Sequence, residues 1–418
     1  MFRTFFVDVS PLRESREYRL LFGGQIISLL GRQLALVAAP FQLYELTGST
    51  LAVGLLGLAQ FPALVVGSFF GGTLSDAFDR RRILMIVQVI MAATSVGLAV
   101  NAGLEAPTVW AIYAFTTANA FFSAIDSPAR SAMIPRLVSA ARLPSAFALN
   151  ILEYTTGAAV GPAIAGFIIG SAGIAEAFWI DAGSFAIALF ALFLMRPLPP
   201  EGGGTAVGWS SVVEGFRFLR GKQELKGVFA VDISAMVFGM PRALFPEFGL
   251  SVLGGNAQTV GLLYAAPGIG SVAAAATSGW VGKVTQPGKA TVAAVLVWSA
   301  GVVGFGLSPT ALPAILFLVM AGAGDAISAV FRQTILQVTT PDRLRGRLSA
   351  VQIAVVAGGP RVGDAEAGVV AGAYGPRVSA WTGGLASAIG AVVVAFAYPA
   401  FRDWRDPETS RGQERRAG

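Results

Sequence analysis

Residues 46–82 read LTGSTLAVGLLGLAQFPALVVGSFFGGTLSDAFDRRR. No charged side chain occurs from 46 to 75, and a charged turn that ends in three arginines follows directly. Because roughly 20 apolar residues cross the ~30 Å core of a bilayer as a helix, this stretch predicts a membrane-spanning helix with its charged end in water. Similar uncharged stretches recur at 83–104, 248–282, 290–324 and 378–401. The chain is therefore expected to be an all-α membrane protein.

The composition agrees with a membrane protein. Hydrophobic residues make up 54% and charged residues 13%, whereas soluble domains carry roughly 25% charged residues. The net charge of +6 lies in short loops beside apolar spans, which argues against nucleic-acid binding. The absence of Cys excludes thiol chemistry and Cys-ligated metals, and the absence of His removes the commonest metal ligand, so no cofactor is expected and any proton coupling must use carboxylates.

Hydropathy and turn signals predict twelve spans. They are expected at about 18–44, 49–75, 82–102, 107–129, 143–170, 175–195, 226–252, 258–282, 289–307, 311–336, 347–372 and 378–401. Basic loops alternate with loops that lack Lys and Arg, and only Arg377 falls on the side predicted to face outward. Basic loops stay in the cytoplasm, so we expect a multi-pass protein of the bacterial inner membrane with both termini cytoplasmic.

The chain also repeats itself. Val53-Gly-Leu-Leu56 recurs as Val260-Gly-Leu-Leu263, and Arg130 is matched by Arg332. We expect two six-helix bundles, 1–196 and 226–402, related by a pseudo-twofold axis along the membrane normal, with the substrate near the midplane between them. A linker with an amphipathic helix, 197–225, and a cytoplasmic tail, 403–418, complete the predicted organisation.

The turn after the second span resembles the signature of the major facilitator superfamily, in which a glycine, an aspartate and basic residues follow at fixed spacing. The resemblance implies a twelve-helix transporter whose cytoplasmic gate includes this turn. Gly72 would allow close helix approach and Asp76 would accept hydrogen bonds from a helix N-terminus. The gate residues expected from the motif and from the fourth span are Gly72, Asp76, Asp79, Arg80, Arg81, Asp126 and Arg130.

Further segments resemble one subgroup of that superfamily. Residues 126–130 (DSPAR), 134–137 (IPRL) and 333–337 (QTILQ) are similar to segments of bacterial drug:proton antiporters and enterobactin (siderophore) exporters. The fifth span carries Gly157, Gly161, Pro162 and Gly166, a pattern similar to the glycine-proline motif of exporters. The same four residues are also compatible with plain small-residue packing around a proline kink.

Ionisable residues inside the spans are the candidate functional residues, since each costs at least ~2.5 kcal/mol without a partner or a cavity. Three arginines near mid-span suit an anionic substrate, although pairing with nearby acids is the alternative. The predicted cavity residues are Arg32, Arg242, Arg361, Gln25, Gln60 and Tyr154, and the predicted proton carriers are Asp232, Glu153 and Asp364. Asp181 lies near the outer end of its span, where simple solvation would explain it.

These features predict a proton-coupled exporter of small amphiphilic, possibly anionic siderophore-like molecules that works by alternating access. The alternatives are a broad multidrug efflux pump and, in another class, a lipid flippase or a non-transporting membrane sensor. No catalytic constellation or nucleotide-binding loop is present, so an enzyme is not expected. The expected partners are the substrate, protons and the bilayer, for a chain acting as a monomer.

Overall fold

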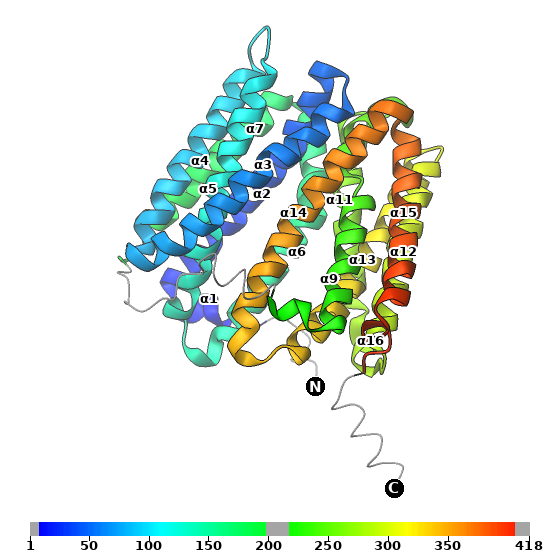
Figure 1. Cartoon of the computed structure of the whole chain (residues 1–418). Helices are drawn as coiled ribbons and strands as arrows, with labels where there is room; N and C mark the ends of the chain where they lie inside the picture. Colours follow the sequence, from blue (N-terminus) through cyan, green and yellow to red (C-terminus); the bar gives the residue numbers. More distant parts are fainter. Residues whose placement is uncertain (1–7, 198–216, 406–418) are drawn as a thin grey trace. The chain divides into compact units, whose positions relative to one another are not determined.

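The computed structural model describes residues 8–197 and 217–405, and their regular structure is entirely helical (Figure 1). The first half contains α1 (Ser10–Glu14), α2 (Arg16–Thr47), α3 (Thr50–Ala77), α4 (Arg80–Ala102), α5 (Val109–Leu137), η2 (Ala140–Arg142), α6 (Leu143–Ser171) and α7 (Ile174–Phe193). The second half contains α9 (Gln223–Phe238), η3 (Arg242–Leu244), α10 (Phe245–Glu247), η4 (Phe248–Val252), α11 (Ala257–Ala276), η5 (Ser278–Lys283), α12 (Pro287–Leu307), α13 (Ala311–Thr339), α14 (Asp342–Tyr374), α15 (Pro376–Ala397) and α16 (Pro399–Arg402).

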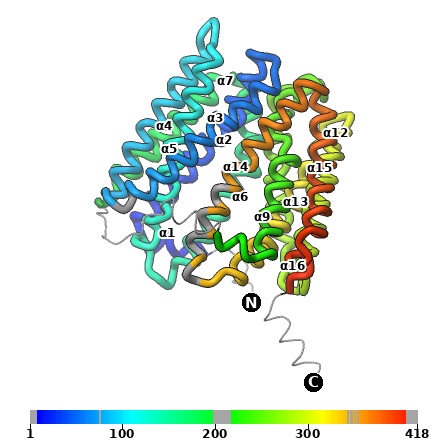
Figure 2. Tube along the Cα trace, viewed as in Figure 1, coloured from blue at the N-terminus to red at the C-terminus, as the bar shows by residue number. Residues whose placement is uncertain are grey.

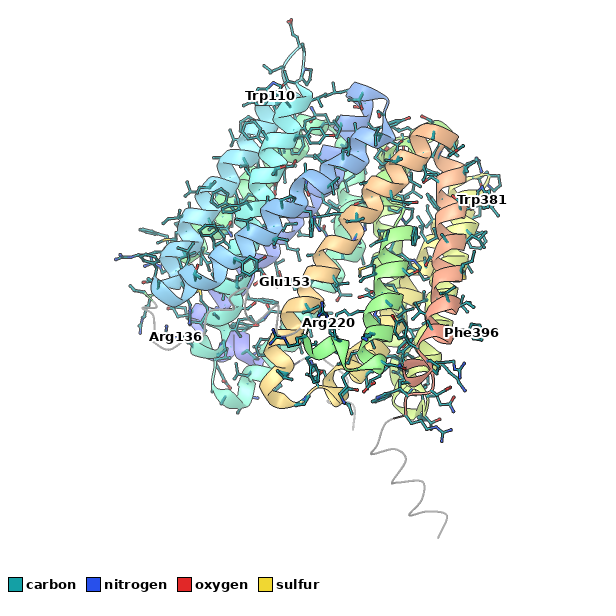
Figure 3. All side chains as sticks on the ribbon, viewed as in Figure 1. Trp110, Arg136, Glu153, Arg220, Trp381 and Phe396 are labelled. Atoms are coloured by element: carbon teal, nitrogen blue, oxygen red, sulfur yellow. The ribbon has the colours of Figure 1, made fainter. Side chains whose placement is uncertain are left out.

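All twelve predicted spans fall on helices, which confirms the all-α membrane prediction. Ten helical stretches in the described ranges are long and apolar enough to cross a membrane. The other two predicted spans fall on α5, with 29 residues, and α14, with 33 residues. Large apolar side chains are exposed along the helices, including Trp110 at 70% and Phe396 at 72% (Figure 3). Such exposure is expected where lipid rather than water contacts the protein.

The chain divides into two compact units, which the colours of Figure 2 help to follow. Unit 1 comprises residues 1–46 and 59–206, and unit 2 comprises residues 47–58 and 207–418. The first turns of α3 thus belong to unit 2, where a Cβ on Gly54 would lie 2.3 Å from the carbonyl oxygen of Asp364 in α14. The linker helix predicted within 197–225 lies mostly outside the described residues, as does most of the tail after 403.

Unit 1 is built around α4, which packs against α5 and α7. Its core contains Tyr18, Leu84, Met91 and Phe185, each almost completely buried. Tyr18 also donates a hydrogen bond of 3.0 Å to the Ala146 carbonyl oxygen, which ties α2 to α6.

Unit 2 packs α12 against α13 and α15, and α11 against α13. Phe245, Phe248 and Phe305 form an aromatic cluster with ring centroids 4.2 and 5.6 Å apart in the two pairs that include Phe305. A Cβ on Gly322 would lie 1.9 Å from the Pro267 carbonyl oxygen, so only glycine permits this approach of α13 to α11.

The span predicted at 226–252 is observed at Gln223–Val252, but its helix is interrupted, which the sequence analysis did not predict. The helix α9 ends at Phe238, and the chain resumes as short helical segments from Arg242 to Val252. Pro241 has no backbone N–H, so it cannot continue the hydrogen bonds of α9. A Cβ on Gly239 would also lie 2.5 Å from Nε1 of Trp298, so a side chain does not fit at the break. Sequence hydropathy does not detect this interruption, because the apolar pattern continues through it.

Candidate functional site

The best-connected polar cluster of unit 1 surrounds Asp126 on α5. Arg130, one turn later, donates to both carboxylate oxygens of Asp126 at 3.1 and 2.8 Å. Gln88 of α4 donates to the same carboxylate at 3.2 Å, and Nη1 of Arg32 from α2 forms a looser ion pair with it at 3.9 Å. Asp126 is 2% exposed, so this carboxylate and its partners lie in the interior of the unit. Arg130 and Arg32 together place two positive charges around one negative charge.

Glu153 of α6, which Figure 3 labels, is a second buried carboxylate of unit 1. It is 8% exposed, and within the part of the chain that the structure describes neither of its carboxylate oxygens accepts a hydrogen bond of good geometry. Arg130 and Arg32 are the charged groups that act on it, and the amide of Gln25 lies next to it. Ionised Glu153 would balance the two arginines, whereas protonated Glu153 leaves the cluster with one excess positive charge.

The glycine-proline motif of α6 packs this helix against α2. A Cβ on Gly157 would lie 2.6 Å from Cδ2 of Leu29, and one on Gly161 would lie 2.6 Å from Cβ of Gln33. Pro162 and Gly166 are buried in the same helix. The motif therefore brings the helix of Glu153 against the helix of Arg32, so helix packing accounts for these glycines.

The turn between α3 and α4 forms a compact polar structure. Asp79 caps α4 by accepting a hydrogen bond of 2.9 Å from the backbone N–H of Arg81. Arg81 donates to the carbonyl oxygens of two residues at the end of α7, and Arg80 donates to the Ala132 carbonyl oxygen at 3.0 Å. These contacts join the ends of α4, α5 and α7 in unit 1.

For two residues of the predicted gate motif, Gly72 and Asp76, the described part of the chain shows no contact that supports their expected roles. The side chain of Asp76 lies outside the described residues. At Gly72 a Cβ would meet no atom within 4 Å, and the close approach of α3 to α5 occurs instead at Gly67 and Gly71.

Asp181 of α7 is completely buried, contrary to its expected solvation. One carboxylate oxygen accepts a hydrogen bond of 2.6 Å from the Ser95 hydroxyl of α4. The other oxygen, Oδ1, has no hydrogen-bond partner among the residues described. Sequence reasoning missed this residue because nothing near position 181 indicates that Ser95 and α2 cover it.

Arg332 of unit 2 matches Arg130 of unit 1 in the internal repeat, but its acidic partner lies on a different helix. Arg332 donates to the Ser328 hydroxyl one turn earlier at 2.8 Å, where unit 1 has Asp126 one turn before Arg130. Its carboxylate partners are Asp232 of α9 at 3.0 Å and Asp325 at 3.7 Å. Asp232 is 5% exposed, so the predicted proton carrier forms a buried ion pair between α9 and α13.

The break in α9 brings the remaining predicted residues together. Oδ1 of Asp364 on α14 accepts a hydrogen bond of 3.0 Å from the backbone N–H of Ala243, and Arg242 and Arg361 are the positive charges that act on this carboxylate. Arg361 donates from Nη1 to the Ala357 carbonyl oxygen at 2.6 Å. Its Nε is buried and has no acceptor among the described residues. This site thus holds two cations, one anion and one unused donor.

The last two predicted cavity residues are more peripheral. Gln60 of α3 is half-buried. Tyr154 of α6 is 70% exposed and follows Glu153 directly.

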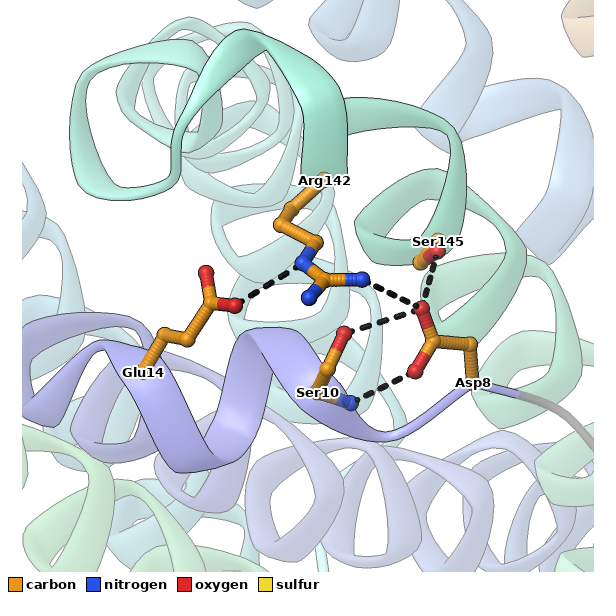
Figure 4. A network of polar contacts seen from close by, with 5 residues as sticks. All are labelled: Asp8, Ser10, Glu14, Arg142 and Ser145. Atoms are coloured by element: carbon orange, nitrogen blue, oxygen red, sulfur yellow. Dashed lines mark hydrogen bonds and ion pairs between the residues drawn. The ribbon is translucent and has the colours of Figure 1, made fainter.

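The N-terminal segment is held against the start of α6 by a polar network (Figure 4). Arg142 donates to Glu14 at 2.8 Å and to Asp8 at 3.4 Å, and the Ser145 hydroxyl donates to Asp8 at 2.9 Å. The pKa of the Asp8 carboxyl is lowered below its usual value. The largest cause is the hydrogen bond from the backbone N–H of Ser10, and the hydroxyls of Ser10 and Ser145 add to it. These contacts hold α1 and the residues before it against the start of α6.

Long apolar helices that bury ion pairs define a polytopic membrane protein, and the match of the chain to a family model of the major facilitator superfamily places it among transporters. Solved structures support that fold. A bacterial homologue of the human lysosomal transporter Spinster, in an inward-facing and occupied conformation, matches with a TM-score of 0.76 at 14% identity, covering 93% of this chain and 98% of that one. The nucleoside transporter NupG (D323A mutant) matches with a TM-score of 0.72 at 15% identity, covering 92% of this chain and 100% of that one.

The chain belongs to the transmembrane secretion effector family, which it matches over residues 7–411. Two similar relatives are named enterobactin exporter EntS. The protein from Citrobacter koseri (strain ATCC BAA-895 / CDC 4225-83 / SGSC4696) is 27% identical over 405 residues, 97% of each chain. The protein from Escherichia coli (strain K12) is 28% identical over 403 residues, covering 96% of this chain and 97% of the relative. The chain is thus a multi-pass membrane transporter of the exporter type.

Proposed function

We propose that this protein is a proton-driven exporter of small amphiphilic anions of the siderophore type, working by alternating access in the bacterial inner membrane. The observation that carries proton coupling is Glu153, a buried carboxylate without hydrogen-bond partners among the described residues, beside two arginines. A buried charge is costly unless it is paired, so the ionised form depends on the positions of those arginines. A movement of either arginine would therefore change the proton occupancy of Glu153.

The proposed cargo rests on the relatives and on the arginines. Relatives similar over nearly the whole chain are named for export of enterobactin. Arg361 keeps a buried Nε donor that meets no acceptor in the described ranges, and Arg32 contacts Asp126 only at 3.9 Å. Guanidinium groups suit carboxylate or catecholate oxygens, because their planar fork can donate two parallel hydrogen bonds. Both arginines thus retain donor capacity for an anionic ligand.

The sign of the coupling constrains this proposal. Protonated Glu153 leaves the cluster with an excess positive charge, so a proton and an anion would favour each other's binding at one site. An inward proton gradient would then drive uptake. Export of an anion therefore requires that the proton and the cargo load from opposite sides, with the conformational change linking them.

A second candidate, efflux of cationic amphiphiles by a multidrug pump, is favoured by the same carboxylate. A cation and a proton compete directly for ionised Glu153, so exchange of one for the other follows without a further linkage. The specific observation that supports this alternative is that neither carboxylate oxygen of Glu153 accepts a hydrogen bond of good geometry from the described residues.

The test is transport in proteoliposomes with an imposed pH gradient, comparing a catecholate or carboxylate cargo with a cationic dye. We expect uphill movement of the anion in the wild type, loss of uphill movement in Glu153→Gln, and retained downhill exchange. Glu176→Gln is the matched control, because Glu176 is an exposed carboxylate in the first turn of α7. Uphill movement of the cation alone would establish the second candidate, and movement of neither compound under the gradient would refute proton coupling.

A further inference from the structure

Asp181 is a buried ionisable group for which the proposed transport cycle has no role so far. It lies on α7, and among the described residues Arg32 is the charged group that acts on this carboxylate. The elements packed around it contribute Ser95 from α4 and the backbone of α2 at Gly31. A buried carboxylate with one donor and one empty oxygen is poorly solvated as an anion.

The packing at Gly31 brings α2 directly onto this carboxyl group. A Cβ on Gly31 would lie 2.1 Å from Oγ of Ser184 and 2.8 Å from Oδ1 of Asp181. Glycine therefore leaves Oδ1 facing the α2 backbone, at the residue next to Arg32. The Ser184 hydroxyl donates its hydrogen bond of 2.7 Å to the Asp181 backbone carbonyl oxygen, so it does not donate to the Asp181 carboxylate.

Arg32 connects this carboxyl group with the cluster around Asp126. The charged groups acting on Arg32 are Asp126, Arg130, Asp181 and Glu153. Arg130 already donates two hydrogen bonds to Asp126, so Arg32 is the more weakly held cation at 3.9 Å. The guanidinium group of Arg32 can leave Asp126 without leaving that carboxylate unpaired.

We propose that Asp181 is a second proton-binding residue of unit 1 and that Arg32 is its counter-ion when the proton has left. In this step the O–H bond of the Asp181 carboxylic acid breaks, the proton passes to water, and Arg32 pairs with the new carboxylate while Arg130 keeps Asp126. The reverse step returns Arg32 toward Asp126. This inference rests on the proposed proton coupling, but its first test does not depend on transport.

Infrared spectroscopy of the purified protein in lipid, titrated with pH and without a gradient or cargo, detects the carbonyl band of a protonated carboxylic acid. We expect Asp181→Asn to remove one component of that band and Glu153→Gln to remove a different one. Ser184→Ala is the matched control and should leave the band unchanged. An identical band in wild type and Asp181→Asn at every pH would show that Asp181 is an ionised structural residue, and would overturn the proposal.

A second variant keeps the carboxyl group and the proposal testable if Asp181→Asn does not fold. Ser95→Ala removes the hydroxyl donor that stabilises ionised Asp181, so the band component should persist to higher pH. No change in Ser95→Ala would contradict the proposal. In proteoliposomes, Asp181→Asn should lose uphill transport and retain downhill exchange, and wild-type uphill transport would also overturn it. Wild-type transport that ignores the pH gradient would refute the proposed function, while the infrared band would still report on Asp181.

Discussion

The coupling between Asp126 and Glu153 gives the sharpest test of the unit 1 cluster. Asp126→Asn removes the carboxylate that accepts two hydrogen bonds from Arg130 and the ion pair from Arg32. Loss of one partner of a buried ion pair costs about 3–5 kcal/mol when nothing replaces it. Here Glu153 can ionise and replace the missing charge, so the single variant should lose less than that range.

The double variant Asp126→Asn/Glu153→Gln has no such replacement. We expect its loss of unfolding free energy to exceed the sum of the single losses by about 0.5–3 kcal/mol, the range for residues that share partners. The measurement is reversible unfolding in mixed detergent micelles, followed by tryptophan fluorescence. The deficit of Asp126→Asn should also grow as the pH falls, because protonation removes the compensating charge of Glu153.

Asp325→Asn supplies the matched control, since the Asp325 side chain is 46% exposed and belongs to unit 2. Combined with Glu153→Gln, its effect should be additive within about 0.3–0.5 kcal/mol. If Asp126→Asn and Glu153→Gln were additive to the same degree, Glu153 would not sense the arginines, and the reasoning on proton coupling would be refuted.

Three further outcomes are expected. Gly31→Ala should be less stable than Gly23→Ala by about 1–3 kcal/mol in thermal unfolding, because a Cβ at position 31 meets neighbouring atoms and one at position 23 does not. Both variants gain the same helix propensity, so that gain cancels in the comparison. Equal stability of the two variants would contradict the close packing at Gly31. The pKa of Asp8 is lowered in the folded protein, so the stabilising contacts of its carboxylate are fully present above the unfolded pKa of about 3.9 and are lost as the pH falls through the lower folded pKa. Proteolysis near the N-terminus should therefore increase in acid. The increase should be smaller in Ser145→Ala, because that variant already lacks the hydrogen bond from Ser145 to Asp8. Arg361→Gln should weaken binding of anionic cargo by about 1.5–3 kcal/mol in equilibrium binding assays and leave neutral lipophilic compounds nearly unaffected, whereas an equal loss for both would assign Arg361 a structural role.

The amino-acid sequence by itself determined the number, type and approximate limits of the spans. The span predicted at 49–75 is observed as α3, Thr50–Ala77, and that at 143–170 as α6, Leu143–Ser171. Hydropathy over about 20 residues is a local property of the chain that determines whether a segment can cross the bilayer, so the spans can be predicted without knowledge of the neighbouring helices. The motif residues likewise indicated the superfamily, because their spacing lies within one turn or one helix.

The tertiary structure decided which charges are paired and where the helices are interrupted. Arg332 forms its buried ion pair with Asp232, 100 positions earlier in the chain, because the residue one turn before it is Ser328 and not an acid. Asp181 is buried by Ser95 and Gly31, which are distant in the sequence, and the break in α9 occurs where Gly239 meets Trp298. These features depend on which helix faces touch, and the hydrophobic effect that places helices in the membrane does not select those faces. Close packing and the satisfaction of buried polar groups select them, and both are properties of the assembled bundle.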